Sequence, residues 1–267
     1  MSVPYAEVIG DPIAHSKSPL IHNFWLARTK TEGAYRAAHV LPNALAAYFE
    51  ARRRDPYWRG CSVTMPHKMA VGPLIASHGN GSPINCIVRE STGLGLFNFD
   101  IDALIDIVPS GTARVALIGS GGAAMATVEA LSGRKVAVIA RDPDKARRLE
   151  ELGSDGYVAW YPFDCAANAL ADAEGLINAT PLGMRGAEPM PASVLDGLHL
   201  LRDEAFVFDM VYDPPRTNLL ERAARSGIRT IDGFTMLVAQ AALAFEKFFA
   251  VPAPREHDAE LRELLTR

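Results

Sequence analysis

Apolar residues recur along this chain with two different periods. Short, nearly continuous apolar runs alternate with longer segments in which apolar residues return every three or four positions. The first pattern is typical of buried β-strands and the second of amphipathic α-helices. Their alternation through most of the chain predicts an α/β fold whose sheets are mostly parallel.

The first part of the chain is predicted to form a mixed sheet. The predicted strands are YAEVIG (5–10), AYRAAHV (34–40), WRGCSVTM (58–65) and INCIVRE (84–90). The predicted helices are SPLIHNFWLART (18–29), with Leu20, Phe24 and Ala27 on its apolar face, and NALAAYFEARRR (43–54). The tight connection STGLG (91–95) joins INCIVRE to a further strand, LFNFD (96–100), so these two strands should be antiparallel.

A different pattern begins near residue 114. RVALIGSGGAAMATVEAL (114–131) predicts a strand, a glycine turn and a helix, and KVAVIAR (135–141) predicts the next strand. Further strands are predicted for EGLINAT (174–180) and AFVFDMVY (205–212), with a helix at NLLERAARSG (218–227). This is a Rossmann-like unit. Two helices, GFTMLVAQAALAFEKFFA (233–250) and REHDAELRELL (255–265), close the chain, and VPSGTAR (108–114) is the candidate hinge between two domains.

Composition narrows the choice of partners. A length of 267 residues suits one large domain or two modest ones, and a net charge of −4 gives no reason to expect nucleic acid or an anionic membrane. The N-terminus lacks a secretory pattern, and no apolar stretch approaches the roughly 18 residues that a membrane span needs. We therefore expect a cytoplasmic protein, either a monomer or a homodimer.

Cysteine and histidine show no metal-ligand spacing, so no catalytic metal is predicted. Cys61 and Cys86 lie inside strand-like runs and are interpreted as small core residues. His67, next to Lys68, is interpreted as a histidine at the rim of a cleft.

The glycine turn fits the dinucleotide pattern G-x-G-x-x-G/A with Gly119, Gly121 and Ala124. Glycine permits the tight turn and the approach of a pyrophosphate, and the helix N-terminus favours the anion. A plain glycine-rich turn is the alternative. The next strand ends in Arg141, where NAD-binding units usually carry an acidic residue, so NADP is preferred over NAD. Asp142 beside it would weaken phosphate binding, and a surface arginine is the alternative.

Three stretches of the first domain offer chemistry. Ser16 and Ser18 lie at a helix start and could hold a small carboxylate, although Ser18 could simply cap the helix. Lys68 follows Pro66 at the end of a strand, where its ammonium group is either solvated or directed into a cleft. Asp100 ends NFD (98–100) and could be either a catalytic carboxylate or a helix N-cap.

Together these stretches resemble the shikimate dehydrogenase family. The matching motifs occur in order over nearly the whole chain: GDPIAHSKSPLIHN, SVTMPHK, NFD, LIGSGGAA, INATPLGM, DMVYDPP and DGFTMLVAQAALAF. The resemblance implies a substrate-binding α/β domain at 1–107, completed by the C-terminal helices at 233–267, and a Rossmann-like NADP-binding domain at 108–232. It implies an enzyme that reversibly reduces 3-dehydroshikimate to shikimate with NADPH, in the chorismate pathway of aromatic amino-acid biosynthesis.

The resemblance also implies roles for individual residues. Ser16 and Ser18 would hold the shikimate carboxylate, and Lys68 and Asp100 would form the acid–base pair at the reacting hydroxyl. The ring hydroxyls would be bound by Thr64, Asn85 and Gln240, with Tyr212 lying over the substrate. The cofactor would be bound by the pyrophosphate turn Gly119, Ser120, Gly121, Gly122 and Ala123, by Arg141 at the 2′-phosphate, and by Thr180, Met184 and Gly233.

The chain departs from the family pattern at several positions. Ser62 stands where the family commonly has asparagine, and Phe99 stands where a small hydroxyl residue is usual. Phe99 would narrow the site if it faced the cleft and would do little if it faced the core. The segment between Lys68 and Asn85 is also shorter than usual, with GNGSP (79–83) before Asn85.

Two other functions remain open at this point. One is a paralogue that acts on quinate or a related cyclohexane carboxylic acid, although serine at both 16 and 18 favours shikimate. The other is a non-catalytic NADP-binding relative, to which Phe99 and the altered segment before Asn85 would point.

Overall fold

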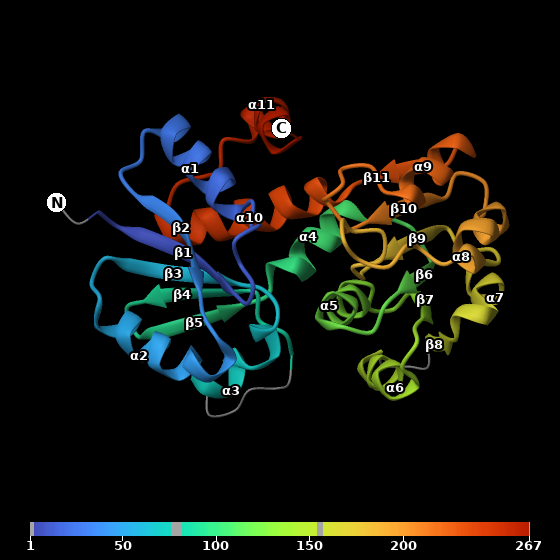
Figure 1. Cartoon of the computed structure of the whole chain (residues 1–267), viewed down its shortest axis with the longest axis horizontal. Coiled ribbons are helices and arrows are strands. Elements are labelled where there is room, and N and C mark those ends of the chain that lie inside the picture. Colours follow the sequence, from blue (N-terminus) through green and yellow to red (C-terminus); the bar gives the residue numbers. More distant parts are fainter. Residues whose placement is uncertain (1–2, 76–81, 154–156, 267) are drawn as a thin grey trace. The chain divides into compact units, whose positions relative to one another are not determined.

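The structure, a computed structural model, describes residues 3–75, 82–153 and 157–266. The chain folds into two compact units, of which unit 1 comprises Met1–Phe99 and Leu237–Arg267 and unit 2 comprises Asp100–Met236 (Figure 1). Both units combine a sheet with helices, so the predicted α/β class is confirmed.

Unit 1 is built on a mixed sheet that, in the described residues, has five strands in the order β2-β1-β3-β4-β5. The strands are β1 (Tyr5–Gly10), β2 (Ala34–His39), β3 (Trp58–Val63), β4 (Cys86–Glu90) and β5 (Gly93–Phe97). β1 is parallel to β2 and β3, whereas β4 is antiparallel to both β3 and β5. The mixed sheet predicted from the sequence is therefore confirmed.

Helices cover both faces of this sheet (Figure 1). They are α1 (Ser18–Thr29), α2 (Leu45–Arg54), α3 (Val71–Ile75), the main part of α10 (Gly233–Phe249), and α11 (Asp258–Thr266). On one face, Ile9 and Trp58 pack with Phe49 of α2. On the other, Val8 and Cys86 pack with residues of α10. Side chains alternate along each strand, so both faces contribute to the core.

The predicted apolar face of α1 is wrong. The helix has the predicted bounds, but its buried residues are Ser18, Ile21, His22, Trp25 and Leu26, and Leu20 and Ala27 are exposed. The prediction fails because His22, although polar, lies on the buried face of the helix. Its ring stacks on Tyr35 with a centroid distance of 3.9 Å and an interplanar angle of 3°.

The hairpin β4–β5 is antiparallel as predicted, but its second strand begins earlier than expected. Glu90 pairs with Gly93, so the turn consists of Ser91 and Thr92 alone, and Gly93 has a φ of +147°. The strand therefore ends at Phe97 rather than at Asp100. Phe99 already begins a helix, α4 (Phe99–Ile107).

Unit 2 contains a parallel sheet, and its described residues give six strands in the order β11-β10-β9-β6-β7-β8. The strands are β6 (Arg114–Ile118), β7 (Lys135–Ile139), β8 (Val158–Tyr161), β9 (Gly175–Asn178), β10 (Phe206–Asp209) and β11 (Arg229–Ile231). The direction of winding reverses between β6 and β9, which is the topological switch point where doubly wound folds bind ligands. The predicted Rossmann-like arrangement is confirmed.

The helices of unit 2 lie on both sides of its sheet. They are α4, α5 (Gly122–Ala130), α6 (Pro143–Leu152), α7 (Ala166–Leu170), α8 (Ala192–Asp196) and α9 (Asn218–Arg225). One core layer packs Ile118 and Val207 of the strands against Ala169 of α7 and Leu220 of α9. Figure 1 shows α5 on the opposite side of this sheet from α7.

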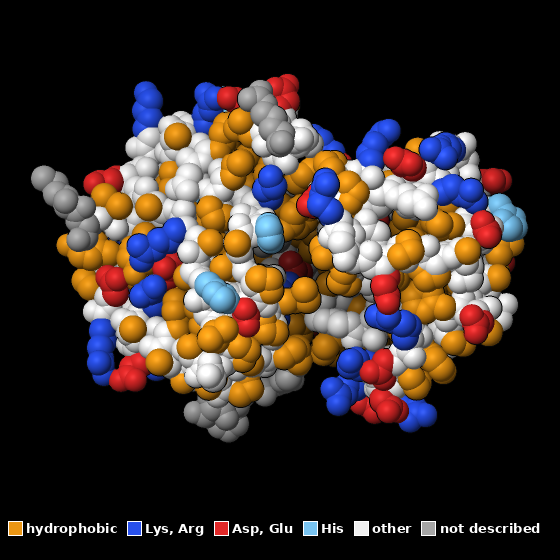
Figure 2. All heavy atoms as spheres, viewed as in Figure 1, with side chains coloured by type: hydrophobic (Ala, Val, Ile, Leu, Met, Phe, Trp, Pro, Cys, Tyr) orange, Lys and Arg blue, Asp and Glu red, His pale blue; other side chains and the backbone are white. Residues whose placement is uncertain are grey.

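The surface carries charges of both signs. Figure 2 shows Lys and Arg side chains interspersed with Asp and Glu over this face of each unit. Among the described residues, no helix is long and apolar enough to span a bilayer.

Burial of His22 predicts a pH-dependent stability. In the described chain neither ring nitrogen has a hydrogen-bond partner, and burial lowers the pKa of His22 from 6.5 to about 3. Between these two values the unfolded chain binds a proton that the folded chain does not. The free energy of unfolding should therefore be fully retained above about pH 6.5 and fall by about 1.4 kcal/mol per pH unit below it.

Urea unfolding at pH 6.5 and pH 5 tests this. The wild type should lose about 2 kcal/mol more than His22→Phe, which keeps the ring stack but cannot bind the proton. His199→Gln, a change at an exposed histidine, is the matched control and should behave like the wild type. Equal pH slopes for the wild type and His22→Phe would contradict the assigned cause.

Candidate functional site

In unit 2, the predicted cofactor residues follow the carboxyl ends of three adjacent strands. Ile118, the last residue of β6, is in register with Ile139 of β7 and Asn178 of β9. Gly119, Arg141 and Thr180 follow these three positions by one or two residues. The structure therefore brings the glycine turn, the arginine and the threonine to one edge of the sheet.

The glycine turn has a strict steric requirement at Gly119. Its φ of +120° disfavours any side chain, and a Cβ there would lie 2.7 Å from Cγ2 of Thr180. Gly121 is the N-cap of α5, and a Cβ at this position would meet no described atom within 4 Å. Ala124 is fully buried, as expected for close packing of helix and strand. The first turn of α5, with Gly122 and Ala123, offers backbone N–H groups to an anion.

Arg141 is exposed, and its guanidinium forms an ion pair. Nη1 donates to Oε2 of Glu188 at 2.9 Å. The neighbouring Asp142 is directed elsewhere, since its Oδ1 accepts the backbone N–H groups of Asp144 and Lys145, both at 3.1 Å, and thereby caps α6. These bonds, above all that from the Lys145 backbone, hold the pKa of the Asp142 carboxyl below its usual value.

A buried polar network holds the loops that follow β9 and β10. Oδ1 of Asp209 accepts from Nδ2 of Asn178 at 2.9 Å and from the backbone N–H of Val211 at 3.0 Å. Its Oδ2 accepts from the hydroxyl of Thr217 at 2.6 Å. Asn178 in turn accepts from the hydroxyl of Thr180 at 2.6 Å. Burial raises the pKa of Asp209, while its hydrogen bonds oppose the shift. Sequence reasoning missed this network, for which the signal is a polar residue ending each of two apolar strands.

The other predicted residues of unit 2 differ in character. Tyr212 is partly buried, with its ring centroid 5.8 Å from that of Phe234, and burial raises the pKa of its phenol. Met184 is exposed. Gly233 has a packing requirement of its own, because a Cβ there would lie 2.5 Å from the carbonyl oxygens of Met210 and Val211.

In unit 1, Ser16 and Ser18 lie at the start of α1. The N-cap is Lys17, and no side chain caps this helix, so the alternative in which Ser18 is the cap is wrong. The hydroxyl oxygen of Ser16 accepts the backbone N–H of Ser18 at 3.3 Å. The two serines thus lie at the start of α1, and neither hydroxyl acts as the N-cap of this helix.

Lys68 lies in a short 3₁₀ turn, His67–Met69, rather than in an α-helix. The turn is fixed at both sides: the Thr64 N–H donates to Ile9 at 3.0 Å, and the Ile84 N–H donates to the carbonyl of Lys68 at 2.8 Å. His67 is buried and its Nε2 donates to the Val40 carbonyl at 2.6 Å, so its interpretation as a rim histidine is wrong.

Asn85 forms backbone hydrogen bonds to two strands. Its carbonyl accepts from the Val63 N–H at 2.7 Å, and its N–H donates to Phe97 at 3.1 Å. Its Oδ1 accepts the N–H of Phe99 at 2.8 Å. Part of the shortened segment, residues 76–81, lies outside the described residues.

Phe99 faces the core of unit 1. It is buried, and its ring stacks on Phe97 at a centroid distance of 5.3 Å. Asp100 is in the first turn of α4 and nearly buried, so the alternative in which it is an N-cap is wrong. An acidic residue in a first turn is stabilised by the helix dipole. Lys68 belongs to unit 1 and Asp100 to unit 2, so their pairing stays a prediction.

Gln240 and Ser62 complete the set. Gln240 lies on α10, with Nε2 donating to the Leu237 carbonyl at 2.8 Å. The hydroxyl of Ser62 accepts from the hydroxyl of Tyr35 at 2.8 Å and is buried. Among the described residues, no cluster of His, Cys, Asp and Glu could hold a metal ion.

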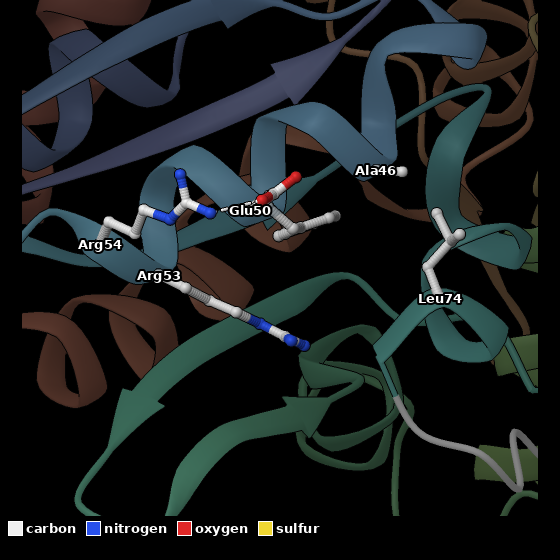
Figure 3. A pocket seen from close by; sticks show the side chains of 6 residues that line it. Ala46, Glu50, Arg53, Arg54 and Leu74 are labelled. Carbon is white, nitrogen blue, oxygen red and sulfur yellow. Dashed lines mark hydrogen bonds and ion pairs between the residues drawn. The ribbon is translucent and has the colours of Figure 1, made fainter.

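A depression of about 280 Å³ lies between α2 and α3, away from these residues. Figure 3 shows the side chains that line it, which are Ala46, Phe49, Glu50, Arg53, Arg54 and Leu74. Arg54 is paired with Glu50 at 2.6 Å. No predicted site residue lines this depression, and it is not assigned as the site.

Comparison with known proteins decides the family. The profile of the shikimate dehydrogenase substrate binding domain matches residues 8–80. A shikimate dehydrogenase (NADP(+)) of Sphingopyxis alaskensis is 48% identical over 98% of this chain and 97% of that protein. The chain belongs to the shikimate dehydrogenase family.

Solved structures of the shikimate dehydrogenase family have the same fold. The enzyme of Mycobacterium tuberculosis has a TM-score of 0.80 at 32% identity, with 98% of this chain and 99% of that one covered. A shikimate 5-dehydrogenase of Thermus thermophilus, in complex with NADP(H) and shikimate, has a TM-score of 0.82 at 28% identity, with 98% and 100% covered. The resemblance and the fold class predicted from the sequence are confirmed.

The Asp209 network predicts a contrast between two substitutions. Asp209→Ala leaves three buried donors without an acceptor and should lower the free energy of unfolding by about 3 kcal/mol or more. Asp209→Asn keeps Oδ1 as acceptor and can donate to Thr217, so it should cost less than about 1 kcal/mol. Urea unfolding of both variants measures the difference.

The wild type and Asp209→Asn should also differ in how their stability depends on pH. Because the pKa of Asp209 is raised in the folded state, the folded chain keeps a proton that the unfolded chain has released. Wild-type stability should therefore fall relative to Asp209→Asn as pH rises from about 4 towards 7. A wild type that gains stability relative to Asp209→Asn over this range would contradict the raised pKa.

Proposed function

We propose that this chain is an NADP-dependent shikimate dehydrogenase that reversibly reduces 3-dehydroshikimate to shikimate in the cytoplasm. The observation that carries the proposal is the 48% identity, over nearly the full length of both chains, to a relative named for this activity. The Thermus thermophilus structure supports the choice of ligands, since that protein holds NADP(H) and shikimate.

The two units have separate roles in this proposal. Unit 1 binds the substrate, which is supported by the substrate binding domain profile over residues 8–80. Unit 2 binds NADP at the carboxyl edge of β6, β7 and β9. The expected domains, 1–107 with 233–267 for the substrate and 108–232 for the cofactor, stay a prediction. The two compact units divide instead after Phe99 and after Met236.

Substrate recognition falls to polar groups that the fold leaves available. The hydroxyls of Ser16 and Ser18 hold the carboxylate beside the first turn of α1. Asn85 has its Oδ1 committed to Phe99, so its Nδ2 is the group that donates to a ring hydroxyl. Thr64 and Gln240 bind the remaining ring hydroxyls. Tyr212 covers the substrate.

Cofactor recognition rests on the turn from Gly119 to Ala123, which surrounds the pyrophosphate with backbone N–H groups and includes Ser120. Arg141 binds the 2′-phosphate, because its planar guanidinium suits a phosphate better than a hydroxyl. Thr180, Met184 and Gly233 line the rest of the dinucleotide. The buried bond from Thr180 to Asn178 gives the loop after β9 a fixed starting point.

The chemistry requires an acid at the ketone oxygen. Bound NADPH supplies the hydride. The negative charge that then develops on the carbonyl oxygen is stabilised by the ammonium group of Lys68, which donates its proton to that oxygen. Asp100 orients Lys68 and exchanges protons with it. In the reverse direction the same pair removes the proton from the hydroxyl.

A cofactor-reduction assay tests the proposal. The near-ultraviolet absorbance of NADPH is followed with shikimate and NADP, and with quinate and NAD as parallel substrates. Lys68→Ala should lower kcat by about 10²- to 10⁴-fold, because general acid–base catalysis is lost. Lys135→Ala, which removes an exposed lysine at the start of β7, is the control and should keep full activity.

Three other results would each change this assignment in a different way. Turnover mainly with quinate would identify the paralogue that acts on the related acid. Absence of turnover with NADP binding intact, measured by calorimetry, would identify a non-catalytic relative. Full activity of Lys68→Ala would remove Lys68 from the mechanism.

A further inference from the structure

Arg141, the residue proposed to bind the 2′-phosphate, is already bound to a carboxylate of the same unit. Its Nη1 lies 2.9 Å from Oε2 of Glu188, and the two side chains are 74% and 69% exposed. The ion pair thus lies in solvent, at the same edge of the sheet as the glycine turn. An anion that binds this guanidinium therefore comes close to the Glu188 carboxylate.

The loop that carries Glu188 is held in place. The carbonyl of Glu188 accepts the N–H of Gly183 at 2.8 Å, and the Ala187 N–H donates to Met184 at 2.9 Å. Gly183 and Gly186 have φ of +84° and +80°, which allows the tight turn. At its start, the Leu182 carbonyl accepts from Asn178 of the buried network at 3.1 Å. These bonds hold the backbone at Glu188, and from this position its carboxylate reaches Arg141.

The remaining charges near Arg141 do not replace this partner. Asp142 caps α6, and its carboxylate is also paired with the ammonium group of Lys145 at 3.3 Å. The charges of Asp142 and Lys145 thus compensate each other on this helix. Arg141 and Glu188 then form a second neutral pair. A 2′-phosphate adds about −1.5 to −2 charges at pH 7, whereas the 2′-hydroxyl of NAD adds none.

We propose that Glu188 is a specificity-determining residue that competes with the 2′-phosphate for Arg141 and weakens the discrimination of NADP from NAD. The inference rests on the proposed binding of NADP at Arg141. NADP must displace the carboxylate and remain near it, whereas NAD binds with the Arg141–Glu188 pair intact. The pair is exposed, and such pairs are weak, so Glu188 reduces the preference for NADP without abolishing it.

Calorimetric titration with two fragments tests the proposal without requiring turnover. The probes are 2′,5′-ADP, which carries the 2′-phosphate, and 5′-AMP, which lacks it. Glu188→Gln should lower the Kd for 2′,5′-ADP by about three- to tenfold and leave that for 5′-AMP within about twofold. This decrease in Kd should be smaller at high salt, because exposed charges are screened. The matched control is Glu221→Gln, which removes an exposed carboxylate paired with Arg225 on α9 and should change neither Kd.

Arg141→Gln separates this inference from the function on which it rests. If Arg141→Gln weakens 2′,5′-ADP selectively but Glu188→Gln changes neither probe, or both equally, the role of Glu188 is overturned and that of Arg141 stands. If Arg141→Gln leaves the preference for 2′,5′-ADP unchanged, the proposed phosphate contact fails and the role of Glu188 fails with it. In the Arg141→Gln background, Glu188→Gln should lower the Kd for 2′,5′-ADP by less than it does in the wild type, because the cation for which Glu188 competes is absent.

Discussion

The buried carboxylate of Asp209 imposes the strongest constraint on the carboxyl edge of the unit 2 sheet. A carboxyl group removed from water at the end of β10 is tolerated only when hydrogen-bond partners surround it, and three donors are supplied by Asn178, Val211 and Thr217. Those donors belong to β9 and to the segment after β10. Satisfying one desolvated group therefore fixes the starts of both loops that carry proposed ligand contacts, including Thr180 and Tyr212.

Asn85 has a comparable position in unit 1, although it is neutral. Its backbone joins β3 to the end of β5, and its side chain accepts the first N–H of α4. The same bonds that complete the sheet edge thus place Asp100, the residue after Phe99. A polar side chain used in this way has only part of its hydrogen-bonding capacity left for the proposed contact with a substrate.

How far the sequence predicts this protein depends on how local the determining contacts are. β1 and α1 have the predicted bounds because apolar period and helix-start residues lie within each segment. The buried face of α1 is different, since His22 is buried through its stack on Tyr35, a residue of another element. Glu188 and Arg141 are 47 positions apart, and no periodicity relates them. The motifs predict which residues carry the chemistry, but they do not show which neighbours those residues already contact.

Two of the departures from the family pattern, Phe99 and Ser62, are accommodated inside the core of unit 1. Phe99 adds its ring to the core beside Phe97 instead of facing a ligand. The hydroxyl oxygen of Ser62 accepts a hydrogen bond from the hydroxyl of Tyr35, whose ring stacks on His22. The serine thereby supplies a hydrogen-bond acceptor to a buried phenol. The surrounding aromatic rings cannot do this, because they pack against the phenol but offer no strong acceptor. Substitution near the proposed site is thus coupled to packing in the core. The backbone at Thr64, Lys68 and Asn85 is held by hydrogen bonds to Ile9, Ile84 and Phe97.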